Sequence, residues 1–345
     1  MKKIKVVVLM GGRSPKHEVS LVTGREVVRN LDKKKYEILP VLISRDGERW
    51  QLKDQREILL HSPSRVEKTD HKRRIRGGKA LLPQGRNLPL KFGKKPDVVF
   101  IAMHGPYGED GTVQGMLELA GLPYTGAGVL ASALGMDKPM FRRVIEERGI
   151  PTPEYLVFEK GENSSIIWKK FKTPLVVKPS SQGSSVGVSI VRRKEELDEA
   201  LKKAFNFGPR VIIEEYLSGT EVTCGVLGNE NPQALPVVEI VPKKEFFDYE
   251  AKYDETKCDE IVPARISRKL TKKVQDLAIR VFKAIDCRGF GRVDMIISQG
   301  KPFVLEINTI PGLTPVSLFP KEASAAGISY SELLDRIISL ALENH

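Results

Sequence analysis

Four polar side chains near the end of the chain have the types and spacing to bind a metal ion and a phosphate group. Arg292 and Asp294 are two residues apart in one predicted strand, and Glu306 and Asn308 are two apart in the next. Residues two apart in a strand share a face, and an odd-numbered loop centred near Gly300 would place Asp294 opposite Glu306. Carboxylate and amide oxygens suit Mg²⁺ held partly by nucleotide phosphates, and a guanidinium suits a phosphoryl group or an oxyanion. A charged face exposed to solvent is the alternative.

Residues 182–187, Gln-Gly-Ser-Ser-Val-Gly, are typical of a loop that covers phosphate groups. Glycines let the backbone approach a ligand closely, and free N–H groups with two hydroxyls can bind phosphate oxygens. The segment joins two predicted strands, whereas a Walker loop or a dinucleotide fingerprint needs a helix after it. We therefore expect a flexible flap over phosphates, and an ordinary hairpin loop is the alternative.

Three lysines are candidates for the same site. Lys178 ends a predicted strand just before the glycine loop, and Lys138 begins a predicted helix. Lys252 lies in a polar segment, residues 247–253, that could close over the site as a lid. Most lysines are surface residues, so the position beside a phosphate loop is what favours Lys178.

The elements that must position these groups follow two different patterns along the chain. In the first part, buried parallel strands are expected at residues 6–9 and 98–101, with helices at 18–31, 116–120 and 138–149. This alternation predicts an open α/β domain that binds its ligand at the carboxyl ends of the strands. In the second part, strands are expected at 174–178, 188–191, 211–214, 221–227, 237–241, 292–297 and 302–307, with helices at 195–205 and 271–284. Strands that follow one another predict an α+β region with antiparallel sheets.

Composition excludes several classes of protein. The 345 residues are 41% hydrophobic and 29% charged, which is ordinary globular usage, and no apolar run approaches the roughly 18 residues of a membrane span. We expect no signal peptide, because the apolar run at residues 6–10 is only a strand's length and is followed by two glycines and not by a small-residue cleavage site. The three cysteines are widely spaced, which argues against a disulfide framework or a zinc site, so a reducing cytoplasm is the simplest setting.

The net charge of +12 is concentrated in one insert. Residues 65–95 contain eleven Lys/Arg against two acids, which gives +9. Phe92 is the single aromatic residue among these charges, so there is no aromatic interleaving of the kind that stacks bases, and we expect a solvated loop and no nucleic-acid partner. A basic regulatory protein that uses this insert is the alternative that is not an enzyme.

Taken in order, these motifs resemble one family, the D-alanine–D-alanine ligases of the ATP-grasp superfamily. The matching segments span nearly the whole chain: residues 11–20, 104–111, 126–138, 178–187, 214–221, 249–253, 289–294 and 306–317. The resemblance implies an N-terminal α/β substrate-binding domain at 1–126, a central ATP-grasp domain at 127–214 and a C-terminal ATP-grasp domain with the metal and catalytic residues at 215–345. It also implies a homodimer.

The resemblance assigns a role to each matching residue. For ATP, it implies contacts from Lys138, Lys178, Ser185, Glu214, Glu215, Leu217, Glu221 and Lys252, with residues 214–217 at the adenine and Glu221 at the ribose. For two Mg²⁺ (or Mn²⁺) ions, it implies Asp294, Glu306 and Asn308. For the two amino acids and the reaction itself, it implies Lys16, Glu18, His104, Ser184, Tyr253, Arg292, Gly312, Ser317 and Leu318.

The reaction implied is the ATP-dependent joining of two D-alanines for peptidoglycan synthesis. ATP phosphorylates the carboxylate of one D-alanine, because a free carboxylate is a poor electrophile, and the amine of the second attacks the acyl phosphate. Arg292 and the Gly312 N–H are expected to stabilise the oxyanion.

Lys16 departs from the family pattern, in which a glutamate at this position holds the ammonium of the first D-alanine. A lysine cannot accept that ammonium's hydrogen bonds. Either Glu18 or another acid takes this role, or the enzyme is a related carboxylate–amine ligase with a different substrate. Tyr253 favours a dipeptide-forming ligase.

Overall fold

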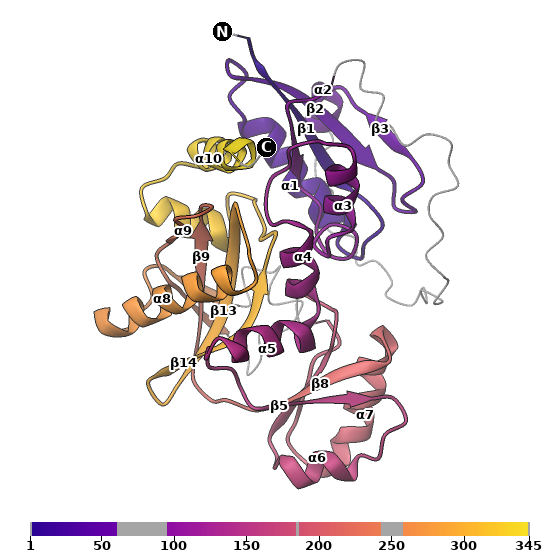
Figure 1. Cartoon of the computed structure of the whole chain (residues 1–345), viewed down its shortest axis with the longest axis vertical. Helices are drawn as coiled ribbons and strands as arrows, with labels where there is room; N and C mark the ends of the chain where they lie inside the picture. Colours follow the sequence, from indigo (N-terminus) through magenta and orange to yellow (C-terminus); the bar gives the residue numbers. More distant parts are fainter. Residues whose placement is uncertain (1, 61–94, 184–185, 243–257, 344–345) are drawn as a thin grey trace. The chain divides into compact units, whose positions relative to one another are not determined.

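The structure is a computed structural model that describes residues 2–60, 95–183, 186–242 and 258–343. The chain forms two compact units, which are described separately here (Figure 1). The first unit contains residues 1–126, 312–320 and 329–345, and the second contains residues 127–311 and 321–328.

The first unit is built on a four-stranded sheet with the order β3-β2-β1-β4. β1 (Ile4–Gly11) pairs in parallel with both β2 (Tyr36–Ile43) and β4 (Val98–Ile101), and β3 (Trp50–Leu52) is an antiparallel edge strand. Its helices are α1 (His17–Asn30), α2 (Gln55–Leu60), α3 (Thr112–Leu119) and α10 (Tyr330–Glu343). Because β2 and β4 flank β1 on opposite sides, the loops after β1 and β4 diverge at the carboxyl ends of these strands, where open α/β sheets bind ligands.

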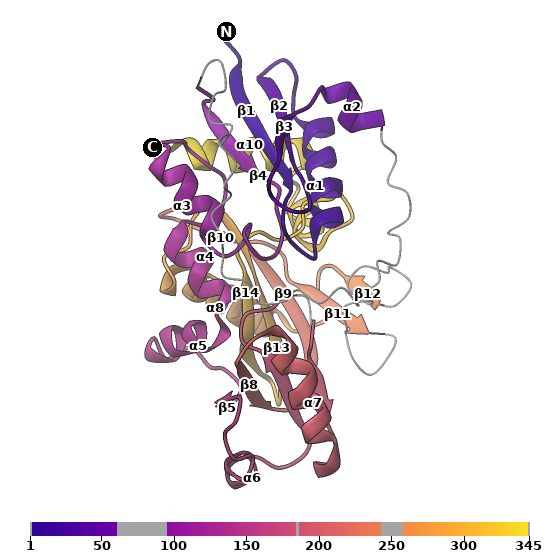
Figure 2. The same cartoon turned by 90° about the vertical axis from the view of Figure 1, so that its right-hand side faces the viewer.

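The second unit contains two antiparallel sheets. The smaller one has the order β5-β8-β6-β7, from β5 (Tyr155–Glu159), β8 (Arg210–Glu215), β6 (Leu175–Pro179) and β7 (Ser189–Val191). α6 (Ser165–Lys170) and α7 (Leu197–Ala204) cover it with apolar side chains that share its core (Figure 2).

The larger sheet has the order β12-β11-β9-β13-β14, with β10 paired to β9. Its strands are β9 (Thr220–Leu227), β10 (Gln233–Ala234), β11 (Val238–Pro242), β12 (Cys258–Ile261), β13 (Phe290–Ser298) and β14 (Lys301–Asn308). α4 (Val129–Met136), α5 (Lys138–Glu147) and α8 (Arg268–Ala284) supply apolar residues to the core of this sheet. α9 (Leu318–Ala325) follows β14 along the chain.

The predicted change from a parallel α/β region to antiparallel sheets is confirmed, and each predicted strand and helix overlaps an observed element, with ends that differ by up to two residues in most of them. Ten elements were not predicted: β2, β3, β5, β10, β12, α2, α4, α6, α9 and α10. β2 contains Pro40, which argues against a central strand in the sequence. The proposed three-domain division stays a prediction, and the structure groups residues 312–320 and 329–345 with the first unit.

Candidate functional site

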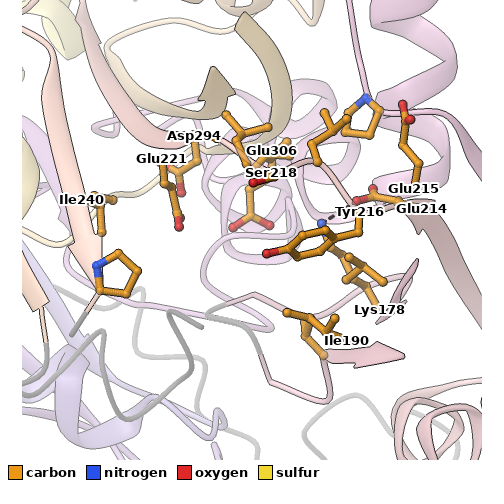
Figure 3. A pocket seen from close by; sticks show the side chains of 18 of the residues that line it. Lys178, Ile190, Glu214, Glu215, Tyr216, Ser218, Glu221, Ile240, Asp294 and Glu306 are labelled. Carbon is orange, nitrogen blue, oxygen red and sulfur yellow. Dashed lines mark hydrogen bonds and ion pairs between the residues drawn. The ribbon is translucent and has the colours of Figure 1, made fainter. Parts of the chain in front are cut away.

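The second unit has a pocket of about 390 Å³ that both of its sheets line. This volume lies in the range of small-molecule sites. Figure 3 shows Glu221 and Asp294 side by side in this pocket, and Lys178 beside Glu214. Among the residues lining it are eight of those predicted to bind nucleotide or metal: Lys138, Lys178, Glu214, Glu215, Leu217, Glu221, Asp294 and Glu306.

The β13–β14 hairpin places the predicted polar group on neighbouring positions. Asp294 faces Glu306 in the register, and Arg292 faces Asn308, as the sequence predicts. The predicted odd-numbered loop was wrong, because the turn consists of two residues, Gln299 and Gly300, both with left-handed φ angles of 48° and 72°. The register instead shifts by one residue between Asp294 and Met295, and this bulge restores the facing pair.

Asp294 is fixed by two partners. Arg292 donates two hydrogen bonds to it, from Nε to Oδ1 at 2.8 Å and from Nη2 to Oδ2 at 2.9 Å. Thr223 donates a third at 2.6 Å. Burial lowers the pKa of Arg292, but the charge and hydrogen bonds of Asp294 outweigh it and raise the pKa, so the guanidinium stays charged.

Lys138 connects the carboxylates to the glycine loop. Its Nζ lies 3.2 Å from Oε2 of Glu306 and 2.5 Å from the carbonyl oxygen of Gln182. Lys138 is the first residue of α5, and the Asp137 carboxylate caps this helix by accepting a hydrogen bond from the Met140 N–H at 3.0 Å. The cap therefore positions the lysine where the predicted phosphate loop begins.

Lys178 is bound to a buried acid, and that acid has a second cation that the sequence analysis missed. Lys178 Nζ lies 2.5 Å from Oε2 of Glu214, while Arg142 Nη2 donates to Oε1 at 2.7 Å. Burial raises the pKa of Glu214, but the charges of Arg142 and Lys178 outweigh it and lower the pKa. Arg142 lies four residues after Lys138, on the same helical face, and this spacing was the available signal.

The donor set suits Mg²⁺. Two carboxylates, Asp294 and Glu306, face each other in the hairpin, and the amide of Asn308 lies two residues further along the strand. Mg²⁺ is commonly held by one or two carboxylates together with substrate phosphates. In the described residues, no group of three or more His, Cys, Asp or Glu is arranged to hold a metal ion.

The predicted adenine segment, residues 214–217, lines the pocket as it leaves β8. The Glu215 side chain accepts a hydrogen bond from the Glu154 N–H at 2.8 Å, so its carboxylate is bound to the segment that precedes β5. The Arg192 guanidinium lies 5.9 Å from the centre of the Tyr216 ring, which gives this wall a cation–π contact.

A second polar cluster lies in the first unit, in the loops after β1 and β4. Lys16 Nζ is 3.2 and 3.4 Å from the two carboxylate oxygens of Glu109. His104 Nδ1 is 3.5 Å from Glu109, and its Nε2 is 2.8 Å from the hydroxyl oxygen of Thr23. Burial raises the pKa of Glu109, but Lys16 and then His104 outweigh it and lower the pKa to about 2. The partner of Lys16 was not predicted.

Glu18 does not lie in that ion pair. Its carboxylate is 2.5 Å from Nη2 of Arg45, and both side chains are about half exposed. Gly312, Ser317 and Leu318 are grouped with the first unit, where the Ser317 hydroxyl donates to or accepts from the Thr314 hydroxyl at 2.7 Å. The remaining predicted residues lie outside the described part of the chain: Ser184, Ser185, Lys252 and Tyr253, with all but the last residue of the basic segment 65–95.

Two family models match the chain. The model described as D-ala D-ala ligase N-terminus matches residues 5–127, and the model described as D-ala D-ala ligase C-terminus matches residues 144–339. A D-alanine–D-alanine ligase of Desulforudis audaxviator is 42% identical over 98% of this chain and 99% of its own length. One of Pelotomaculum thermopropionicum is 41% identical over 99% and 98%.

Solved structures agree with these matches. The D-alanine–D-alanine ligase of Coxiella burnetii is 34% identical with a TM-score of 0.84, over 100% of this chain and 95% of that one. The VanG D-Ala:D-Ser ligase of Enterococcus faecalis is 36% identical with a TM-score of 0.82, over 99% and 100%. The Bacillus anthracis D-alanine–D-alanine ligase complexed with ATP is 36% identical with a TM-score of 0.77, over 100% and 98%. None of the helices in the described ranges is long and apolar enough to cross a bilayer.

Proposed function

Because the chain belongs to the D-alanine–D-alanine ligase family, we propose that it joins two D-alanines at the expense of ATP. The products are the dipeptide, ADP and phosphate, formed through a D-alanyl phosphate, and the dipeptide serves peptidoglycan synthesis. The observation that carries this proposal is the set of three cation–carboxylate pairs around the pocket: Arg292–Asp294, Lys138–Glu306 and Lys178–Glu214.

These pairs suit a site that receives a highly charged substrate. Each cation lies against an acid around the pocket, so the buried charges compensate one another. An ammonium has three donors, so Lys138 and Lys178 can bind phosphate oxygens of ATP while they keep their carboxylate partners. The glycine loop contributes backbone N–H groups next to them. The protein thus provides positioned positive charge where the transferred phosphoryl group develops negative charge.

Asp294, Glu306 and Asn308 would hold two Mg²⁺ or Mn²⁺ ions. Such ions neutralise phosphate charge and polarise the phosphoryl oxygens. Arg292 lies on the same strand face and keeps its charge, so it is our candidate for stabilising the oxyanion formed when the second amine attacks, together with the Gly312 N–H.

The remaining assignments are part of the same proposal. Ser185 and Lys252 contact ATP with Glu215, Leu217 and Glu221. The residues that place the amino acids are His104, Ser184, Tyr253, Ser317 and Leu318. The enzyme works in the cytoplasm as a homodimer, without a nucleic-acid or membrane partner.

A second candidate function concerns the first substrate, and the Lys16–Glu109 pair favours it. Lys16 already hydrogen-bonds both oxygens of Glu109, so a substrate ammonium that enters this cluster must bind Glu109 against the like charge of Lys16. If D-alanine does so, Glu109 takes the role first assigned to Glu18. If it does not, the preferred first substrate lacks the α-ammonium, and the enzyme is a related carboxylate–amine ligase.

Phosphate release with D-alanine, Mg²⁺ and ATP tests the main proposal, with the dipeptide identified by mass spectrometry. We expect D-alanine-dependent turnover in the parent and a loss of at least about 10³-fold in Asp294→Asn, because a metal ligand and the partner of Arg292 change together. ATP turnover without dipeptide at any D-alanine concentration would contradict it.

A panel of D-amino acids and D-2-hydroxy acids as first substrate decides between the two candidates. Lys16→Glu should lower the KM for the first D-alanine if Lys16 opposes its ammonium, and Lys34→Glu, at an exposed position, is the matched control. A hydroxy acid preferred over D-alanine by the parent would favour the second candidate.

A further inference from the structure

We infer that Arg142 is a positioning residue of the nucleotide site, which acts on Lys178 through Glu214. The inference rests on the proposed binding of ATP by Lys178. Arg142 does not line the pocket, whereas Lys178 and Glu214 do. Arg142 is 1% exposed, and it is the largest fully buried side chain in the described part of the chain.

The hydrogen bonds of Glu214 define the relay. One carboxylate oxygen accepts from Arg142 at 2.7 Å, and the other accepts from Lys178 at 2.5 Å. Glu214 is itself 1% exposed, and it lies near the end of β8, where it lines the pocket. With one oxygen fixed by Arg142, the second oxygen has a defined direction, and the flexible Lys178 side chain is held by it (Figure 3).

The charges also indicate that Arg142 acts on Lys178 through Glu214. Glu214 with a single cation would be a neutral pair, and its lysine would have no excess charge to offer a phosphate. With Arg142 included, Arg142, Glu214 and Lys178 together carry a net charge of +1. Lys178 is the cation of this group that lines the pocket. Arg142, which does not line the pocket, therefore neutralises Glu214 and leaves the charge of Lys178 available to the nucleotide.

Arg142 also connects the two sheets that line the pocket. Nη2 bonds Glu214 on β8, and Nη1 donates to the carbonyl oxygen of Val304 on β14. The same face of α5 carries Lys138, which bonds Gln182 and Glu306. One helix thus positions both lysines that are predicted to bind phosphate. A planar guanidinium can donate to two acceptors in different directions, whereas an ammonium on a flexible side chain is less well oriented.

Arg142→Met tests the relay, with Arg143→Met as the matched control, since Arg143 is an exposed arginine on the same helix. The readouts are the dissociation constant of ATP with Mg²⁺ by calorimetry, the KM of each substrate and the thermal unfolding midpoint. We expect ATP affinity to fall at least tenfold in Arg142→Met while the KM for D-alanine changes less than twofold. Arg143→Met should stay within twofold of the parent in both.

Arg142→Lys is the second variant, and it decides the matter if Arg142→Met does not fold. A lysine keeps the charge but not the fork, so ATP affinity should fall two- to fivefold with the D-alanine KM unchanged. Parent-like ATP affinity in a folded Arg142→Met, or in Arg142→Lys when the methionine variant is unfolded, would overturn the inference. So would a parallel loss for both substrates that follows the unfolding midpoint, because that marks a purely structural role.

A double substitution tests whether Arg142 acts through Glu214. In the Glu214→Gln background, Arg142→Met should weaken ATP binding by less than a further twofold, because the relay is already cut. A full additional tenfold loss would show that Arg142 acts by another route. Since ATP binding is measured directly, a parent that binds ATP but makes no dipeptide would refute the proposed function and leave this test valid.

Discussion

Glu214 and Glu322 are both buried carboxyl groups of the second unit, and the structure treats them in opposite ways. Glu214 has a cation on each oxygen, and its pKa is lowered although burial opposes this. Glu322, on α9, is 0% exposed, and no described side chain donates a hydrogen bond to it. Burial raises its pKa well above the usual value, even though the charge of Arg292 opposes the shift.

The difference shows what a buried carboxylate needs in order to stay charged. Arg292 donates two hydrogen bonds to Asp294, so its charge acts on Glu322 without a direct bond. A distant charge does not replace lost hydration, so the pKa of Glu322 remains well above its usual value. Lysines and arginines contact the acids of the pocket directly, and four substitutions test whether such contacts decide how a buried carboxyl group behaves.

Glu214→Leu should have the largest effect. It leaves Arg142 and Lys178 buried without their acid, and removing one partner of a buried ion pair costs about 3 to 5 kcal/mol. Urea unfolding followed by circular dichroism measures the loss. Glu215→Gln, at the next residue, is the control and should cost about 1 kcal/mol or less, since an amide oxygen can still accept the Glu154 N–H. Equal losses in the two variants would contradict the comparison.

Glu109→Gln tests a third carboxylate, which contacts Lys16 and His104. Its pKa is lowered to about 2 from 4.5. The stability that the charge provides is therefore complete above about pH 4.5 and is lost as the pH falls toward 2, and the shift corresponds to about 3 kcal/mol. The stability difference between parent and variant, measured by urea unfolding between pH 6 and pH 3, should shrink as the pH falls. A difference independent of pH would show that Glu109 is not held ionised by Lys16.

Glu322→Gln should act in the opposite direction. A raised folded pKa contributes full stability below the unfolded pKa near 4.5, and this stability is lost as the pH rises toward the folded value. A glutamine does not ionise, so the variant should gain stability relative to the parent as the pH rises, by at most about 1.4 kcal/mol for each pH unit in that window. Thermal unfolding at pH 5, 6, 7 and 8 checks the trend. A variant that loses stability with rising pH would mean that Glu322 is ionised.

Arg336→Gln should have the smallest effect. Arg336 and Glu332 form an i,i+4 pair in α10 at 2.7 Å, but both side chains are 46% exposed. Exposed pairs of this kind contribute about 0.3 to 0.5 kcal/mol, and salt screens them. The change in the unfolding midpoint should be near the limit of detection and should disappear in 1 M NaCl. A decrease of several kcal/mol in the free energy of unfolding would show that exposure does not determine how much such pairs contribute to stability.

The sequence predicted the pocket strands well because their signals are local. Alternating apolar residues on both sides of Gly300 fixed two strands and the faces that carry Asp294 and Glu306. The length of the turn between them could not be predicted from the sequence, because a bulge on β14 compensates for the two-residue turn. α10 was missed although its buried residues follow a helical spacing: Leu333, Leu334, Ile337, Ile338 and Ala341.

The identities of the lysines and carboxylates, their strands and their order along the chain were determined by the sequence itself. Which acid neutralises which cation was decided by tertiary structure, since the partners are far apart: Lys16 and Glu109 by 93 residues, and Arg142 and Glu214 by 72. Local propensity carries no information about such pairs, because their energy depends on burial and on distances that arise when separate elements pack. Arg142 has ordinary helix surroundings in the sequence, and only the fold turns it toward the back of the nucleotide site.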